Sequence, residues 1–190
     1  MQDPSPDPYA PPKTDVNQAP VLRPSALPDY FVISSPWVIV LPPLTFGIFA
    51  IYWAYRQWHA LKTSGEKVNP LGRGIFLIFF IHALFRQIHW ARTQSGLTAG
   101  RAGSGMATAF VILTILANIA GRAGASLAFL ATILLTFFSS FILSLAQDDI
   151  NELSRKVGSN TNRRIGVGGI IVIVLSAALF LSTVTLVLRA

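Results

Sequence analysis

The histidines are the first side chains in this sequence that are able to do acid–base or metal chemistry, because imidazole titrates near neutral pH and binds metal ions. There are three, His59, His82 and His89, and none has a carboxylate at the spacing of metal ligands. The chain has no cysteine, which excludes a thiolate metal site, a disulfide and a cysteine nucleophile. His82 lies deepest within an apolar stretch, so a proton-linked role and hydrogen-bonded packing are its two interpretations. We expect no metal site and no cofactor.

One acidic cluster lies beyond the N-terminal tail. Asp148, Asp149 and Glu152 follow an apolar run, and Glu152 has basic residues three and four positions later, at helical salt-bridge spacing. Carboxylates paired in this way on a helix surface are not expected to act as a catalytic pair. An enzyme acting on lipid headgroups through His59, His82 or Asp148 is the least favoured hypothesis, because it requires these side chains to converge. We predict no catalytic residue and no enzymatic activity.

Polar side chains inside apolar stretches are the remaining candidates for a functional role. Hydroxyl and amide groups in membrane helices hydrogen-bond between helices, at about 0.6 kcal/mol each. They are also able to line a polar path for a substrate. We favour packing and keep the path as the alternative. The candidate positions are His82, Arg86, Asn118, Thr132, Thr136 and Ser140.

The elements that must position these side chains are membrane helices. Only 12% of the 190 residues are charged and 52% are apolar, with a mean hydropathy of +0.55. A soluble domain carries about 25% charged residues. Uncharged runs of 26, 12, 20, 25 and 24 residues begin at Tyr30, Gly74, Ala102, Ala123 and Ile165. All but the second reach the roughly 20 residues that cross a hydrocarbon core about 30 Å thick, which predicts a multi-pass membrane protein.

The positive charges decide between four and five spans. If all five runs cross the membrane, the 15 Lys and Arg residues divide nine to six between the two sides. If the short run over 74–85 does not cross, they divide eleven to four, which the positive-inside rule prefers. We therefore predict an all-α integral membrane helical bundle with four transmembrane helices plus one re-entrant or interfacial helix. Five spans are the alternative.

The chain divides into a tail and a membrane domain. Residues 1–29 hold eight of the twelve prolines and are predicted to be a disordered, proline-rich tail. Residues 30–190 form the membrane domain, in which Pro42 and Pro43 are predicted to kink the first helix. A glycine-containing turn over 121–124 is predicted to separate the third and fourth helices. The predicted helices cover about 36–60, 73–91, 105–120, 125–157 and 165–188.

A family resemblance begins in the first apolar run. Residues 45–58 read TFGIFAIYWAYRQW, and residues 70–76 read PLGRGIF. The first stretch resembles the T-x-G-[IL]-[YF]-x-x-Y-W-x-Y-[RK]-x-W signature of a family of small bacterial multi-pass membrane proteins of unknown function. The second is similar to that family's P-x-x-R-x-x-F segment, and Gln147 and Asn151 resemble the polar pair after its fourth helix. The resemblance implies topology and a bacterial inner (cytoplasmic) membrane location, because the family has no assigned activity. The matching positions are Gly47, Tyr52, Trp53, Tyr55, Arg56, Trp58, Pro70 and Arg73.

These patterns predict a non-enzymatic inner-membrane protein that acts as an accessory, scaffold or assembly factor. The alternative is an oligomeric small channel or transporter subunit that uses the hydroxyl side chains and His82 as a polar path. The net charge of +7 lies mainly in loops, where it sets topology and meets anionic lipid, so no nucleic-acid partner is expected. The expected partner is the lipid bilayer, and a homo-oligomer or another membrane protein is left open.

Overall fold

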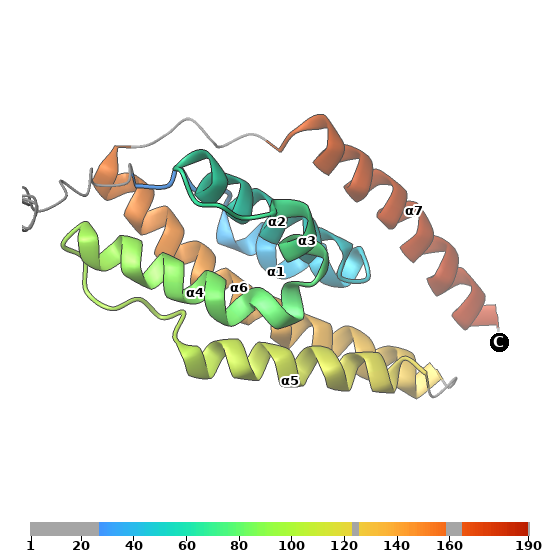
Figure 1. The fold of residues 1–190 in the computed structure, drawn as a ribbon. Coiled ribbons are helices and arrows are strands. Elements are labelled where there is room, and N and C mark those ends of the chain that lie inside the picture. Colours follow the sequence, from blue (N-terminus) through green and yellow to red (C-terminus); the bar gives the residue numbers. More distant parts are fainter. Residues whose placement is uncertain (1–26, 123–125, 159–164, 190) are drawn as a thin grey trace, which may run out of the picture.

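The fold is helical throughout the part of the chain that the structure describes. The computed structural model describes residues 27–122, 126–158 and 165–189, and within these ranges it has seven helices and no strand (Figure 1). The helices are α1 (Ser35–Leu44), α2 (Ile48–Thr63), α3 (Pro70–Ile75), α4 (Leu77–Gln94), α5 (Ser104–Ala120), α6 (Ser126–Val157) and α7 (Val167–Arg189). The predicted all-α class is confirmed.

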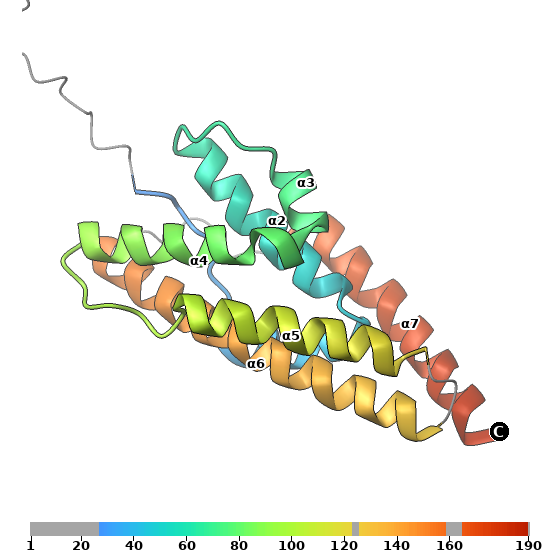
Figure 2. The same cartoon turned by 60° about the horizontal axis from the view of Figure 1, so that its bottom comes forward.

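The single kinked helix predicted over 36–60 is wrong, because the chain reverses inside it. Figure 1 shows the chain turning back between α1 and α2, so the two helices form a hairpin (α2 is also clear in Figure 2). Pro42 and Pro43 remove two amide hydrogens from the end of α1. Phe46 then has φ of +49° and Gly47 has φ of +85°. Two successive residues with positive φ end a right-handed helix rather than bend it.

Thr45 joins the two helices at this turn. Its hydroxyl donates to the carbonyl oxygen of Leu41 at 2.8 Å and accepts from the backbone N–H of Phe49 at 2.9 Å. The residue is buried. One side chain thus adds a bond to a terminal carbonyl of α1, which also accepts from the backbone N–H of Thr45 at 3.0 Å, and satisfies an initial amide of α2.

The helix predicted over 73–91 is also divided. Asn69 begins α3, because its Oδ1 accepts from the backbone N–H of Gly72 at 3.2 Å, and Pro70 occupies the first helical position. The helical conformation is interrupted at Phe76, where ψ is 38°, and α4 begins at the next residue. Both views show α4 running beside α5 in the opposite direction.

The last three helices lie within two residues of the predicted ranges 105–120, 125–157 and 165–188. The longest, α6, has 32 residues and is about 48 Å long. It packs against both α5 and α1. Residues 1–26 of the predicted tail and residues 123–125 of the predicted turn lie outside the described residues.

Many large apolar side chains lie on the outer surface of the helices. Among the described residues, one helix, Ala128–Val157, is long and apolar enough to cross a membrane, with a mean hydropathy of 2.2 in its most apolar window. Three shorter apolar helices cover Ser35–Leu44, Ser104–Ala120 and Gly169–Thr185. Large side chains such as Phe138 and Leu181 are more than half exposed. Exposed apolar surface of this extent indicates membrane association.

The core lies where the α1–α2 hairpin meets α4 and α6. Five of the six largest fully buried side chains come from the hairpin and the segment before it: Tyr30, Phe31, Phe49, Trp53 and Trp58. Phe85 and Ile88 of α4 and Leu143 of α6 complete the core. The hairpin is therefore the centre of the fold.

Gly47→Ala is expected to lower the free energy of unfolding by about 1 kcal/mol, because a Cβ disfavours the left-handed backbone region. No atom lies within 4 Å of the added Cβ, so backbone conformation is the only cause. Gly105→Ala is the control, since that site is equally open and its φ is not positive. Thermal unfolding in detergent measures both variants, and equal stability of the two would contradict the turn geometry.

Candidate functional site

Three buried or half-buried amide side chains bind the backbone segment that precedes α1. We call Gln57, Gln147 and Asn151 the polar junction. Gln57 exchanges two hydrogen bonds with Phe31: its Oε1 accepts from the backbone N–H at 3.0 Å, and its Nε2 donates to the carbonyl oxygen at 3.1 Å. Gln147 Nε2 donates to the same carbonyl oxygen at 3.2 Å, and Asn151 Nδ2 donates to that of Ile33 at 3.0 Å. Side chains thus provide the hydrogen bonds that a neighbouring strand would supply in a sheet.

Gln147 also binds two further side chains, Trp53 of α2 and Asn151 of the polar junction. Trp53 Nε1 donates to Gln147 Oε1 at 2.6 Å, and Gln147 Nε2 donates to Asn151 Oδ1 at 2.8 Å. Trp53, Gln57 and Gln147 are 0% exposed. A buried polar group left without a partner costs about 1–3 kcal/mol, so this network fixes α2 against α6. At its margin, burial raises the pKa of Tyr30 well above the usual value, so the phenol stays protonated.

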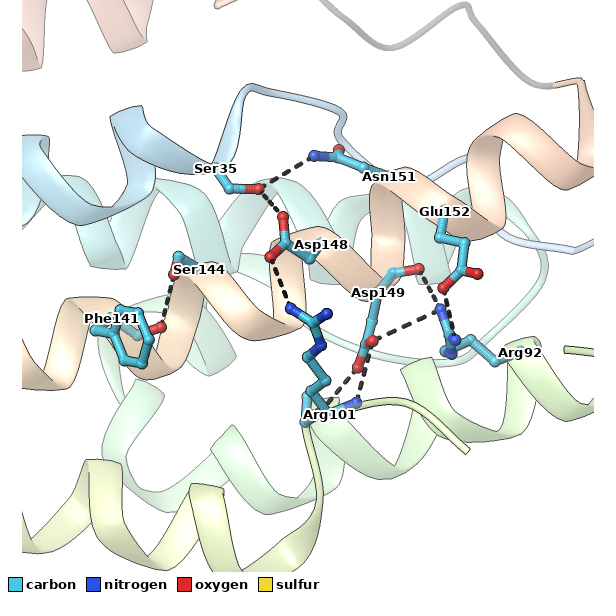
Figure 3. Close-up of polar contacts among 10 residues, drawn as sticks. Ser35, Arg92, Arg101, Phe141, Ser144, Asp148, Asp149, Asn151 and Glu152 are labelled. Atoms are coloured by element: carbon cyan, nitrogen blue, oxygen red, sulfur yellow. Dashed lines mark hydrogen bonds and ion pairs between the residues drawn. The ribbon is translucent and has the colours of Figure 1, made fainter. Parts of the chain in front are cut away.

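A buried ion pair lies beside the polar junction (Figure 3). Arg92 of α4 is 3% exposed, and its Nη1 lies 3.6 Å from Oδ1 of Asp149. Nη1 also donates to the carbonyl oxygen of Asp149 at 3.0 Å, and Nη2 donates to Oε2 of Glu152 at 2.8 Å. We call Arg92, Asp149 and Glu152 the ion cluster. It ties the end of α4 to the end of α6.

The carboxylate of Asp149 also holds the loop between α4 and α5. It accepts from the backbone N–H of Arg101 at 3.1 Å and from that of Ala102 at 2.9 Å. Gly100 makes this approach possible, because a Cβ at that residue would lie 2.2 Å from Asp149 Oδ2. The loop is therefore fixed by the same carboxylate that neutralises Arg92.

Ser35 and Asp148 connect the polar junction to the ion cluster. The Ser35 hydroxyl donates to Asp148 Oδ1 and accepts from Asn151 Nδ2 at 3.4 Å (Figure 3). Asp148 Oδ2 in turn lies 3.7 Å from Nη1 of Arg101. An open cavity of about 830 Å³ adjoins these groups and includes Trp37 in its lining. One continuous polar network thus joins α1, α2, α4 and α6 at one end of the molecule.

The aromatic motif places Tyr52 and Arg56 on the side of α2 that faces the start of α7. The Tyr52 hydroxyl accepts from Arg56 Nη1 at 2.8 Å and from the backbone N–H of Gly166 at 3.2 Å. The Arg56 guanidinium lies 4.3 Å from the centre of the Phe31 ring, within cation–π range. Gly169 lies against Tyr52 so closely that a Cβ would be 2.6 Å from the ring. Tyr52 is thus a close contact between α2 and the start of α7.

The second part of the motif joins α2 to α3. A Cβ on Gly74 would lie 3.1 Å from the backbone nitrogen of Tyr55, so the two helices touch at this glycine. The Arg73 guanidinium lies 4.4 Å from the centre of the Trp58 ring. With Gly47 at the hairpin turn, these family-like positions have inter-helix or turn contacts. The resemblance itself stays a prediction.

Four of the predicted polar positions come together. Asn118, Thr132 and Thr136 line a cavity of about 320 Å³, and Asn118, Thr136 and Ser140 line an adjoining cavity of about 370 Å³. Thr136 donates to the carbonyl oxygen of Thr132 at 2.8 Å, Ser140 to that of Thr136 at 2.7 Å, and Asn118 to that of Thr114 at 2.8 Å. The two hydroxyl donors and one N–H of the Asn118 amide are therefore already used within their own helices.

The other two predicted positions, His82 and Arg86, lie elsewhere. A ring nitrogen of His82 is 3.1 Å from the Thr108 hydroxyl, and both residues are exposed, as is Arg86. His59 is exposed on α2, and Asp148 belongs to the polar network, so neither shares the contact of His82. Within the described ranges, no group of three or more His, Asp or Glu side chains is placed to hold a metal ion.

Sequence reasoning missed Gln57 and Arg92 as site residues. For Arg92 a signal existed, because it continues the face of α4 that carries Ile81, Leu84 and Ile88, all of which are buried. A charged residue in phase with a buried face predicts a buried ion pair. Gln57 is an amide in an aromatic run, and its partner Phe31 is 26 residues away in the sequence. No local pattern identifies that contact.

Comparison with known proteins gives no match. No protein-family model, no curated protein and no solved structure matches this chain.

Asp149→Asn is expected to lower the free energy of unfolding by about 3 kcal/mol, because Arg92 stays buried while the buried carboxylate beside it loses its charge. The control is Arg101→Gln, whose side chain is 71% exposed in its pair with Asp148. An exposed pair contributes about 1 kcal/mol or less. Denaturant or thermal unfolding in detergent compares the two variants, and a larger loss for Arg101→Gln would contradict the assignment.

Proposed function

We propose that the protein is a non-enzymatic scaffold of the bacterial inner membrane, with three crossing helices and a re-entrant hairpin. The crossing helices are α5, α6 and α7. The α1–α2 hairpin dips into the membrane and returns to the same side, and α3–α4 enters from that side as well. This topology differs from the predicted four spans only in the first apolar run, which reverses instead of crossing.

Two features of the hairpin support this topology. α1 has 10 residues and is about 15 Å long, which is half of a hydrocarbon core about 30 Å thick. Phe31, before α1, bonds to Gln57, in the second half of α2. The chain therefore returns to the level at which it enters, as a re-entrant element requires.

The distribution of positive charge supports it further. If the hairpin returns to the side from which it enters, thirteen of the fifteen Lys and Arg residues lie on one side of the membrane. Arg122 and Arg189 lie on the other. This division is more uneven than the eleven-to-four division of the four-span arrangement, and the positive-inside rule assigns the basic side to the cytoplasm.

The observation that carries the scaffold role is the continuous polar network. Its members come from α1, α2, α4 and α6, and its central side chains, Trp53, Gln57 and Gln147, are completely buried. Their polar atoms bind backbone and one another, so they serve to hold helices in one arrangement. A rigid basic face on the cytoplasmic side suits an accessory or assembly factor. Its partners are the lipid bilayer and a second copy or another membrane protein.

A small channel or transporter subunit is the second candidate. The observation that favours it is the pair of adjoining cavities lined by Asn118, Thr136 and Ser140. The hydroxyl donors of Thr136 and Ser140 are used by their own helix, which supports packing more than a water-filled path. His82 contributes to neither cavity.

Single cysteines test the topology, because the chain has no cysteine of its own. Ser34→Cys, Lys67→Cys and Thr98→Cys are expected to react with a membrane-impermeant maleimide from the cytoplasmic side. Arg122→Cys is expected to react from the opposite side. All four positions are exposed. Labelling of Ser34→Cys together with Arg122→Cys would restore the four-span arrangement, and labelling of Lys67→Cys and Thr98→Cys from opposite sides would restore five spans.

Liposome flux separates the two functions. The scaffold predicts no ion or solute flux above empty liposomes for the wild type. A channel predicts flux that Thr136→Val lowers, while His82→Gln, outside the cavities, is the matched control and leaves it unchanged. The scaffold hypothesis also predicts a positive result. The protein purified in mild detergent from its native membrane is expected to carry a partner or a second copy at fixed stoichiometry. A bare monomer would contradict that role.

A further inference from the structure

The hairpin stops partway along α6 and leaves space beneath its turn. Pro43 and Phe46, at the turn of the hairpin, lie at the level of Thr132 and Thr136 on α6, because all four line the same cavity. This cavity of about 320 Å³ adjoins the larger one of about 370 Å³. The four residues that line both are Phe46, Ala117, Asn118 and Thr136.

The two cavities differ in polarity. The larger one is lined mainly by apolar side chains, among them Ile51, Leu77 and Phe110. The smaller one reaches Arg122 at the turn that follows α5. The combined space is thus apolar toward the hairpin and cationic at its outer mouth, which is the chemistry of an amphipathic anion.

Arg122 is available for such a ligand. Its side chain is exposed, and it forms no ion pair within the described residues. Asn118 and Thr132 lie beside it in the cavity lining. The Thr132 hydroxyl donates to the carbonyl oxygen of Ala128, and the Asn118 amide donates one of its two N–H groups to that of Thr114. Arg122 is the cation among these donors, and an incoming anion pairs with it.

We propose that these cavities bind one phospholipid from the leaflet opposite the basic face. An acyl chain occupies the larger cavity beside the hairpin, and the phosphate pairs with Arg122 in the lining of the smaller one. Charge complementarity at Arg122 and the apolar lining select this occupant, because each buried methylene contributes about 0.8 kcal/mol and an arginine–phosphate pair forms a charge-assisted hydrogen bond. The inference rests on the proposed topology, which puts Arg122 on the side that the hairpin does not reach.

Native mass spectrometry of the full chain in mild detergent, with added phosphatidylglycerol, tests this site. The wild type is expected to retain one lipid. Arg122→Gln is expected to weaken retention about tenfold, the loss expected from one charge-assisted hydrogen bond. Arg189→Gln is the control, because it removes an exposed cation that the topology assigns to the same side.

A second pair of variants tests the acyl chain. Thr136→Phe fills the part of the space that both cavities share, and it is expected to lower retention by at least as much as Arg122→Gln. Leu134→Phe adds similar bulk at a half-exposed position of α6 that lines neither cavity, and it is expected to leave retention unchanged. Equal retention by Thr136→Phe and Leu134→Phe, or by Arg122→Gln and Arg189→Gln, would overturn the lipid site.

Cysteine labelling keeps the two proposals apart. Suppose that Ser34→Cys and Lys67→Cys label from one side, while lipid retention is the same in the wild type and in all four cavity and control variants. The topology then stands and the lipid site is overturned. If Ser34→Cys labels from the side of Arg122→Cys, the topology itself fails. Flux through the wild type that Thr136→Phe blocks would assign the cavities to a water path and overturn the lipid site.

Discussion

The structure depends on how the backbone at Phe31 and Ile33 obtains its hydrogen bonds. This segment is extended and mostly buried, and the described fold has no strand to pair it. Buried N–H and C=O groups without partners are costly, so the amides of Gln57, Gln147 and Asn151 must supply the bonds. Because these amides come from α2 and α6, satisfying one short segment also fixes the hairpin against the longest helix.

The ion cluster extends the same principle to the loops. Burial of Arg92 takes its positive charge out of water, and this is favourable only where good geometry and further hydrogen bonds compensate for the lost hydration. Here Asp149 neutralises Arg92 and at the same time accepts from two backbone amides after Gly100. A single carboxylate therefore couples the end of α4, the α4–α5 loop and α6. Loss of its charge therefore weakens contacts of three elements, whereas loss of the exposed Arg101–Asp148 pair weakens one contact at the surface.

Sequence reasoning predicted the helices whose ends are determined locally. The bounds of α5, α6 and α7 follow from charge-free length and from glycines, which are local properties. The hairpin was missed because proline is tolerated inside membrane helices, so Pro42 and Pro43 favour a kink as readily as an end. The turn is stabilised by Thr45, whose hydroxyl bonds to both helices, together with the positive φ angles of Phe46 and Gly47. Among the site residues, Gln147 and Asn151 had a family-like position, but Gln57 bonds to residues 26 and 90 positions away, which no local pattern reveals.

The short reach of the hairpin makes the two halves of the molecule unequal in thickness. In the proposed topology all seven helices pass through or enter the cytoplasmic half of the bilayer, while only α5, α6 and α7 continue through the other half. The protein then has the shape of a wedge. Each copy displaces more lipid area on the cytoplasmic side than on the other. Copies that associate side by side would therefore bend the bilayer so that its cytoplasmic face is convex.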